Sequence, residues 1–238
     1  MTDPLVRISK LLAERGICSR READSYLERG LVFIEGRPAV LGERAAPDAR
    51  ITLAPQARAR QGLRLTVLLN KPVGYVSGQP EKGYESAHVL LTPGAYAGPA
   101  PAPRVPTALN VAGRLDIDSQ GLLVLTEDGR IARLLIGGHD VEKEYLVRLT
   151  APIDERALAV LRGPLLLDEK PLRPVRIERL GPDYLSMTLT EGRKRQIRRM
   201  LMQVDHQVRG LKRVRIGRIR LGGLGVGQWR VLTPAERF

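Results

Sequence analysis

The sequence is poor in the residues that build disulfides, metal centres and membrane spans. Cys18 is the only cysteine, which excludes an intramolecular disulfide and any multi-cysteine metal site. His88, His139 and His206 lack the spacing of metal ligands, so we expect no zinc or iron centre. No apolar run approaches the roughly 20 residues that span a bilayer, and the N-terminus lacks the apolar core of a signal peptide. We therefore expect a cytoplasmic protein without a membrane partner.

Acidic residues are also scarce relative to basic ones. Lys and Arg number 39 against 26 Asp and Glu, which gives a formal net charge of +13. Residues 192–238 carry 13 basic residues against two acidic ones, whereas residues 1–60 carry 11 against eight and residues 61–191 are nearly balanced. Solubility alone does not require such a concentration near the C-terminus. The distribution therefore favours a polyanionic partner, above all nucleic acid.

The N-terminal residues have the pattern of a small α+β module. Apolar residues between Val6 and Leu12 follow a helical period, and Ser19 followed by Glu22 has the spacing of a capping box that starts a second helix. The run Leu31–Ile34 before a Glu-Gly pair predicts a strand and a tight turn. We expect a module of about 60 residues with two helices and a small sheet.

This module resembles a known RNA-binding domain. The string ISKLLAERGICSRREADSYLERGLVFIEG is similar to the S4 domain, which is found in a ribosomal protein and in several RNA-modifying enzymes. The resemblance implies that Lys10, Ser19, Arg20 and Arg21 contact RNA phosphate, and helix N-termini and guanidinium groups both suit this task. The alternative for the two arginines is a solvated helix start.

Two segments after the module lack the periodicity of a core. Residues 54–64 are interpreted as a linker, and residues 79–106, rich in Ala, Pro and Gly, as an extended or mobile insertion without a core of its own. Between them a strand at residues 65–69 leads into a bend at which Pro72 presents Lys71. Lys71 could contact RNA or border the site as a structural residue.

A compact charged cluster lies directly before a strongly apolar strand. The stretch VAGRLDIDSQGLLVLTEDG places Asp116 and Asp118 just ahead of an apolar run that has the length of a buried strand. A carboxylate at the mouth of such a strand is held rigidly, as a catalytic group must be. A turn or capping role is the alternative for either aspartate.

Two later motifs offer possible partners for these carboxylates. Tyr145 lies in an alternating strand, where an ordinary core position is the alternative to a functional one. Residues 192–202 predict a helix, and at about 100 degrees per residue its basic side chains cannot all face solvent. A desolvated arginine requires an anionic partner, and Asp116 is the candidate.

Four motifs together resemble one enzyme family. In order and spacing, LNKPVG, GRLDIDSQGLLVLTEDG, EKEYLV and EGRKRQIRRM are similar to the motifs of the RsuA/RluB/RluE/RluF family of pseudouridine synthases. The resemblance implies an isomerase that needs no cofactor or metal. It also implies an α+β protein: an S4 domain at residues 1–60, then a catalytic domain at residues 61–238 whose mixed, largely antiparallel sheet is flanked by helices.

The family motifs also imply roles for individual residues. Asp116 would be the essential carboxylate, Tyr145 the aromatic that packs on the target base, and Arg198 the basic partner of Asp116. Arg114 would help hold the flipped nucleotide, and Asp118 is left with a structural role. Arg193 and Arg195 are expected as phosphate contacts only.

The chemistry explains these residue types. Isomerisation breaks the C1′–N1 bond of uridine, turns the bound uracil and rejoins it through C5. A stacked base is inaccessible, so the nucleotide should be extruded into a pocket, where an aromatic face permits rotation in the ring plane. Whether the carboxylate attacks C1′, adds to C6 or abstracts a proton stays open at this level.

The substrate is predicted less sharply than the reaction. The elements SRREAD, DSQGL and EKEY are most similar to the branch of the family that modifies 23S ribosomal RNA and also has a tRNA activity. One alternative is a synthase for another ribosomal uridine, in either subunit. Another is a non-catalytic RNA-binding or ribosome-assembly protein on the same fold. We expect a monomer.

Overall fold

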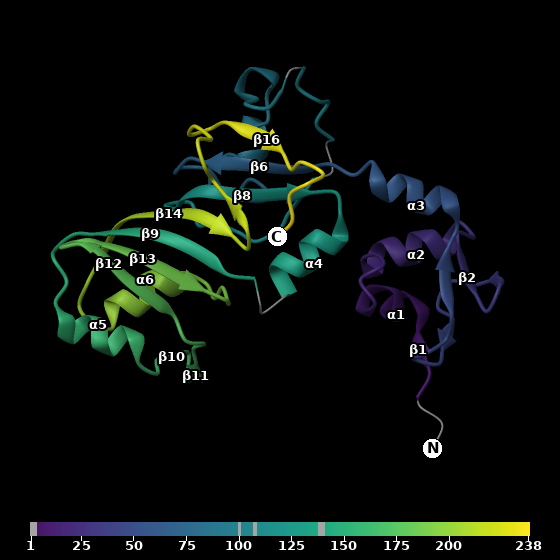
Figure 1. The fold of residues 1–238 in the computed structure, drawn as a ribbon, viewed down its shortest axis with the longest axis horizontal. Coiled ribbons are helices and arrows are strands. Elements are labelled where there is room, and N and C mark those ends of the chain that lie inside the picture. Colours follow the sequence, from purple (N-terminus) through teal and green to yellow (C-terminus); the bar gives the residue numbers. More distant parts are fainter. Residues whose placement is uncertain (1–3, 100, 107–108, 138–140) are drawn as a thin grey trace. The chain divides into compact units, whose positions relative to one another are not determined.

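A computed structural model of the chain describes residues 4–99, 101–106, 109–137 and 141–238 (Figure 1). The chain falls into two compact units. The N-terminal unit comprises Met1–Thr66, Pro106–Ala112 and Thr126–Gly137, and the C-terminal unit comprises Val67–Val105, Gly113–Leu125 and Gly138–Phe238. The expected N-terminal module is thus joined in its unit by two short segments from later in the chain.

The N-terminal unit contains the two helices and the small sheet that the sequence predicts. Its elements are β1 (Val6–Arg7), α1 (Ile8–Glu14), α2 (Arg20–Glu28), β2 (Val32–Ile34), β3 (Arg37–Pro38), β4 (Arg44–Ala45), β5 (Ile51–Leu53), α3 (Pro55–Gly62), β7 (Asn110–Val111) and α4 (Gly129–Gly137). Strands β3, β2 and β5 form one antiparallel sheet, and β1 pairs with β4. Both helices bury apolar side chains, among them Ile8, Leu12, Ala23 and Tyr26.

The capping box at the start of α2 is confirmed. The Ser19 hydroxyl accepts a hydrogen bond from the Glu22 amide at 3.3 Å, and the Glu22 carboxylate accepts one from the Ser19 amide at 2.7 Å. The Ser19 and Glu22 amides are therefore each satisfied by the side chain of the other residue.

The prediction of a linker at residues 54–64 is wrong, because most of this segment forms helix α3. Pro55 occupies the first helical turn, where its missing amide hydrogen costs nothing and its fixed φ suits the helix. Ala57 is fully buried and the Gln61 side-chain amide donates to the Ile17 carbonyl at 2.9 Å. The apolar period was faint because alanine and glutamine make the inward contacts.

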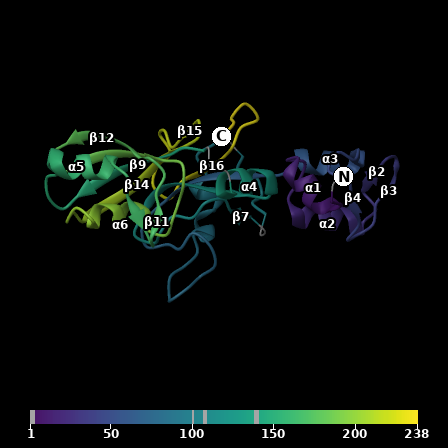
Figure 2. The same cartoon turned by 90° about the horizontal axis from the view of Figure 1, so that it is seen from below.

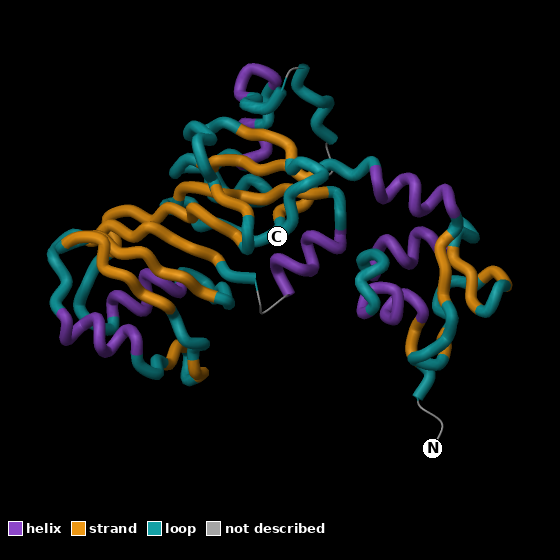
Figure 3. The backbone as a smooth tube through the Cα atoms, in the orientation of Figure 1, coloured by secondary structure: helices purple, strands orange, loops and turns teal. Residues whose placement is uncertain are grey.

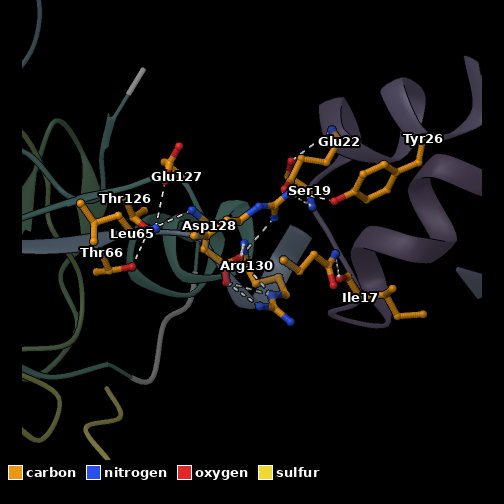
Figure 4. Close-up of polar contacts among 12 residues, drawn as sticks. Ile17, Ser19, Glu22, Tyr26, Leu65, Thr66, Thr126, Glu127, Asp128 and Arg130 are labelled. Atoms are coloured by element: carbon orange, nitrogen blue, oxygen red, sulfur yellow. Dashed lines mark hydrogen bonds and ion pairs between the residues drawn. The ribbon is translucent and has the colours of Figure 1, made fainter. Parts of the chain in front are cut away.

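A polar network joins α2 to the start of α4 within the N-terminal unit (Figure 4). Arg64 forms an ion pair with Glu22, lies 3.9 Å from the Asp128 carboxylate and donates to the Tyr26 hydroxyl at 2.8 Å. A Cβ at Gly129 would lie 2.4 Å from the Glu22 carboxylate and from the Ser19 Cβ, so only glycine lets the start of α4 approach the start of α2 this closely.

The C-terminal unit is built on one mixed sheet (Figure 3). Its strands follow the order β12-β13-β9-β14-β8-β6-β16, and β15 pairs with β14. Strands β8 and β14 run parallel, whereas β12–β13, β13–β9, β9–β14 and β6–β16 are antiparallel, which confirms the predicted mixed, largely antiparallel sheet. The bounds are β6 (Thr66–Lys71), β8 (Gln120–Thr126), β9 (Lys143–Leu149), β10 (Leu166–Leu167), β11 (Lys170–Pro171), β12 (Arg176–Gly181), β13 (Tyr184–Leu189), β14 (Val208–Ile216), β15 (Ile219–Arg220) and β16 (Trp229–Val231).

Helices α5 (Glu155–Arg162) and α6 (Gln196–Met202) cover one face of β9, β13 and β14. The apolar side chains that meet there are fully or almost fully buried. They are Val147, Leu149, Leu158, Leu161, Leu185, Met187, Ile197, Met200 and Leu201. Alternation along β9 and β13 then leaves the intervening side chains on the face away from these helices.

The insertion at residues 79–106 is packed over part of its length, which corrects the expectation of an extended or mobile loop. Figure 2 shows its first part, blue in the colour scale, as a loop that leaves the sheet. Beyond it lie two short 3-10 helices, Ala87–Leu90 and Pro93–Ala95. The indole nitrogen of Trp229 donates to the Thr92 carbonyl at 2.7 Å, and the ring centres of Tyr96 and Trp229 lie 4.7 Å apart.

No helix within the described ranges is long and apolar enough to cross a bilayer.

Candidate active site

Residues 113–118, which we name the Asp116 segment, lead directly into strand β8. Every carbonyl of this segment accepts a hydrogen bond. The donors are the Arg213 guanidinium to Gly113 (3.1 Å) and Arg114 (3.4 Å), the Ser77 hydroxyl to Leu115 (2.6 Å), the Ser119 amide to Asp116 (3.1 Å), the Gly74 amide to Ile117 (2.8 Å) and the Arg198 guanidinium to Asp118 (2.9 Å).

These donors come from separate parts of the C-terminal unit. Arg213 lies on β14, Arg198 on α6, and Gly74 and Ser77 on the loop that follows β6. Because a buried carbonyl without a partner costs free energy, the side chains that satisfy these groups also fix the path of the segment. The half-buried Asp116 is thus anchored through the backbone on both sides.

Arg213 is the residue that the sequence reasoning missed. Its side chain is 1% exposed, and besides its bonds to the Asp116 segment it donates from Nε to the Leu122 carbonyl at 2.8 Å. Its guanidinium lies 6.0 Å from the ring centre of Tyr145, within the range of a cation–π contact. Strand alternation could have found it, because Leu211 and Arg213 share the inward face of β14.

Gly121 of the DSQGL element has a steric reason to be glycine. Its φ is +111°, and a Cβ there would lie 2.3 Å from the Arg213 carbonyl oxygen. Strands β8 and β14 therefore approach as closely as they do only because this position has no side chain. The same approach brings Arg213 to the Asp116 segment.

Two arginines of the EGRKRQIRRM motif, Arg195 and Arg198, contact the Asp118 carboxylate. Arg195 binds its carboxylate with both terminal nitrogens, at 2.7 and 3.2 Å, and the Arg198 Nε lies 3.3 Å from the same carboxylate. Burial alone would raise the pKa of the Asp118 carboxyl, but the hydrogen bonds of Arg195 and the charges of both arginines together lower it. Asp118 therefore holds Arg195 and Arg198, at the start of α6, against the Asp116 segment.

The direct pair expected between Arg198 and Asp116 is not formed among the described residues. Arg198 contacts Asp118 instead, because the turn from Asp116 to Ser119 carries the second carboxylate to the start of α6. Burial lowers the pKa of the Arg198 guanidinium, and the charges of Asp118 and Asp116 oppose this shift. Asp116 therefore acts on Arg198 through its charge at longer range.

Arg195 has a left-handed backbone, with φ +52°, at the residue before α6. This conformation is costly for any residue other than glycine and persists only where surrounding contacts enforce it. Here the bidentate pair with Asp118 is such a contact. The arrangement favours an organising role for Arg195 over the phosphate contact that was expected.

Lys71 also lies inside the unit and not on its surface. Its side chain is fully buried, and its ammonium group donates to the carbonyls of Pro72 (2.8 Å) and Tyr75 (2.9 Å). Burial lowers the pKa of Lys71 to about 8, although the charges of Asp118 and Asp116 oppose the shift. Of the two roles considered, RNA contact or structural border, this geometry favours the structural one.

Arg193 is likewise engaged internally. Its guanidinium donates to the carbonyls of Leu167 (2.9 Å), Lys170 (3.1 Å) and Pro171, and its Nε lies 3.4 Å from the Glu191 carboxylate. These bonds hold the β10–β11 hairpin. They favour a structural role over the expected phosphate contact, because the donors are already used.

Of the remaining predicted RNA-binding side chains, all but Ser19 are exposed. Arg114 is 76% exposed, with Glu81 at 4.0 Å. In the N-terminal unit, Arg20 and Arg21 are exposed on the first turn of α2, and Lys10 is exposed on α1, 3.5 Å from Glu14. Ser19 differs from them, because its amide and hydroxyl are both engaged in the capping box.

The site therefore offers one half-buried carboxylate on a fixed turn, surrounded by cations that are held by other acceptors. The charge of Asp116 acts on Lys71, Arg195 and Arg198. Within the described part of the chain, no group of three His, Cys, Asp or Glu residues is arranged to hold a metal ion. Such a carboxylate suits nucleophilic or acid–base chemistry on a bound substrate.

Known proteins are similar to this chain in sequence and in fold. Residues 65–203 match the RNA pseudouridylate synthase family. The chain is 35% identical over 240 residues to the dual-specificity RNA pseudouridine synthase RluF of Escherichia coli K12, covering 99% of this chain and 78% of the relative. It is 34% identical over 235 residues to an uncharacterized RNA pseudouridine synthase of Aquifex aeolicus, covering 97% and 94%.

A solved structure agrees with these relatives. The crystal structure of a pseudouridylate synthase aligns with a TM-score of 0.63 at 27% identity and covers 96% of each chain. The family match includes the Asp116 segment, Tyr145 and α6. The chain therefore belongs to the RNA pseudouridylate synthase family and is an isomerase that acts on RNA.

Proposed function

We propose that this enzyme isomerises a specific uridine of 23S ribosomal RNA and that Asp116 is its catalytic carboxylate. The observation that carries the proposal is the hydrogen bonding of all six carbonyls of the Asp116 segment. A catalytic group that must meet a rotating base needs a fixed backbone, since small misplacements cost large factors in rate. A carboxylate with only a turn role would not need donors from three separate elements.

Tyr145 and the arginines have complementary roles in this proposal. Tyr145 stacks on the extruded uracil, which contributes roughly 1–3 kcal/mol and leaves rotation in the ring plane permitted. Arg213 contacts both the Tyr145 ring and the Asp116 segment, so it links the two. Arg198 supports the site through Asp118 and through its charge, and the exposed Arg114 contacts the flipped nucleotide.

The reaction requires no group beyond the substrate and these side chains. The C1′–N1 bond breaks, the uracil turns, C1′–C5 forms, and the proton displaced from C5 is balanced by the one that N1 gains. Atoms and electrons are conserved, so no redox partner is consumed. The Asp116 carboxylate acts on the sugar or the base as a nucleophile or base.

The substrate assignment rests on likeness. The Escherichia coli relative is named a dual-specificity enzyme, and we propose that this chain likewise accepts a tRNA beside 23S ribosomal RNA. The exposed Arg20 and Arg21 at the start of α2, with Lys10 on α1, provide phosphate contacts away from the reacting base.

Pseudouridine-specific chemical labelling of cellular RNA tests this proposal. RNA from a deletion strain of the source organism is compared with RNA from the same strain carrying the wild-type gene or Asp116→Asn. We expect one labelled position in 23S ribosomal RNA, and one in a tRNA, to disappear on deletion and return only with the wild type. Labelling restored by Asp116→Asn would contradict the catalytic role, and labelling that changes only in 16S RNA would contradict the substrate.

A further inference from the structure

We propose that Ser77 is a positioning residue for the Asp116 carboxylate, an inference that rests on the proposed function of Asp116. Ser77 lies on the loop after β6, far from Asp116 in the sequence. Its hydroxyl donates to the Leu115 carbonyl at 2.6 Å and accepts from the Leu115 amide at 2.9 Å. Leu115 immediately precedes Asp116, so both polar groups of the neighbouring residue are held by one side chain.

A hydroxyl is the group that this geometry requires. In an antiparallel sheet, a residue can exchange both an N–H and a C=O bond with the residue opposite. Here a single side chain takes the place of that opposite residue, because a hydroxyl is a donor and an acceptor at once. Ser77 is 1% exposed and Leu115 5%, so water does not compete for these bonds.

Ser77 is itself held by the insertion. The Val76 amide donates to the Glu85 carbonyl at 3.0 Å, and the Ala87 amide donates to the Val76 carbonyl at 2.8 Å. Ala87 is fully buried. The start of the Ala/Pro/Gly-rich insertion therefore supports the residue that supports the Asp116 segment, which gives this part of the insertion a task in catalysis.

The burial of Ser77 separates its effect on rate from an effect on affinity. A side chain that is 1% exposed offers no surface to RNA, so its loss should leave phosphate contacts intact. Its loss would free the backbone next to Asp116 on one side. Because a misplacement of about 1 Å can cost about 100-fold in rate, the chemical step should be the part that suffers.

The test uses purified full-length protein and a ribosomal RNA fragment that contains the mapped uridine. Single-turnover rate constants at saturating RNA, RNA dissociation constants and thermal midpoints are measured for Ser77→Ala, Ser77→Thr and Ser186→Ala. Ser186 is a matched control: it is 9% exposed, and its hydroxyl donates to Glu144 at 3.3 Å on the sheet face away from Met187 and the helices. Asp116→Asn is included as the reference for a lost carboxylate.

We expect Ser77→Ala to lower the rate constant by about 10–100-fold, with the RNA dissociation constant within about threefold of the wild type. Ser77→Thr, which keeps the hydroxyl, should be several-fold faster than Ser77→Ala, and Ser186→Ala should keep the wild-type rate. Should Ser77→Ala fail to fold, Ser77→Cys, with a weaker donor and acceptor, replaces it in the same comparison.

A Ser77→Ala rate equal to that of the wild type, or an equal loss in Ser186→Ala, would overturn the proposal. So would a Ser77→Thr variant no faster than Ser77→Ala. These outcomes differ from a failure of the proposed function, because that failure appears as turnover by Asp116→Asn. An inactive Asp116→Asn together with a normal Ser77→Ala would remove the inference about Ser77 alone.

Discussion

Basic side chains at the start of α2 and basic side chains around Asp116 differ in how they are used. Arg20 and Arg21 are exposed on the first turn of α2. Arg213 and Lys71 are almost completely buried, and their donors bond to carbonyls of the same unit. The comparison shows that a basic residue in an RNA-modifying enzyme is not by itself evidence of an RNA contact.

The difference follows from the cost of burying charge. A guanidinium removed from water must find acceptors inside the protein, and those acceptors then orient it. The acceptors of Arg213 include the carbonyls of Gly113 and Arg114. An exposed guanidinium instead keeps its donors for phosphate and releases counterions when it binds. Buried cations should therefore control structure and rate, and exposed cations affinity.

The largest expected effect comes from removing a buried cation. Arg213→Ala leaves the carbonyls of Gly113, Arg114 and Leu122 without their donor and opens a cavity, so we expect a loss of roughly 3–5 kcal/mol in the free energy of unfolding. Activity should be lost with it. Denaturant unfolding measures the change.

Arg215→Ala is the matched control on the same strand. Its guanidinium is paired with Glu142 and Glu144 and does not contact the Asp116 segment. We expect a smaller loss, on the order of 1–2 kcal/mol, and a near-normal rate per folded molecule. Equal losses in the two variants would contradict a special role for Arg213.

Asp118→Asn should lower the single-turnover rate by about 10–100-fold, because Arg195 and Arg198 lose their carboxylate and the start of α6 is released. Its folded pKa is lowered, so its stabilising effect is present above the unfolded pKa and is lost as pH falls through the folded pKa. The variant should therefore lose stability at neutral pH and converge with the wild type in acid.

Asp183→Asn provides the control for this change, since Asp183 pairs with Arg148 at 3.4 Å on an exposed part of the unit. Its rate should be unchanged. Thermal melts from neutral to acidic pH, together with the rate measurement, decide the comparison. A pH dependence in Asp118→Asn identical to that of the wild type would count against the role of this carboxylate.

Lys71 should make stability depend on alkaline pH. Its folded pKa of about 8 lies below the unfolded value, so the unfolded chain binds more protons and stability rises as pH passes upward through 8. We expect a gain on the order of 1–2 kcal/mol between about pH 7.5 and 9.5. Lys71→Met should abolish that gain, whereas Lys10→Met, at an exposed position, should keep it.

Much of the fold could be predicted from local patterns. The capping box of Ser19 and Glu22 specifies the start of α2, and the apolar run after Gly121 specifies β8, because both depend on neighbours in the sequence. Helix α3 was not predicted, because its inward residues are only weakly apolar. Its inward face is marked by the burial of Ala57 and by the tertiary contact of Gln61 with Ile17.

The site was predictable as a set of residue types but not as a set of contacts. The sequence brings Asp116, Asp118 and Arg198 into one constellation, yet which carboxylate meets Arg198 depends on a turn of four residues. The use of Lys71 and Arg193 as internal donors depends on burial, which a charge pattern does not encode. Strand alternation indicates that Arg213 faces inward, but the carbonyls that Arg213 and Ser77 bind have no signature in the sequence.

The smallest expected effect tests the comparison most directly, through the salt dependence of RNA binding. The dissociation constant is measured against salt concentration for the wild type, for Arg20→Gln with Arg21→Gln, and for Arg195→Gln. We predict that the double variant binds about 3–10-fold more weakly and that its log–log slope falls by roughly 1.5, about 0.7–0.9 for each lost phosphate contact. Arg195→Gln should keep the wild-type slope and lose rate. An equal fall in slope for Arg195→Gln, or an unchanged slope for the double variant, would contradict the division between exposed cations that bind RNA and cations, such as Arg195 on Asp118, that are paired inside the protein and organise the site.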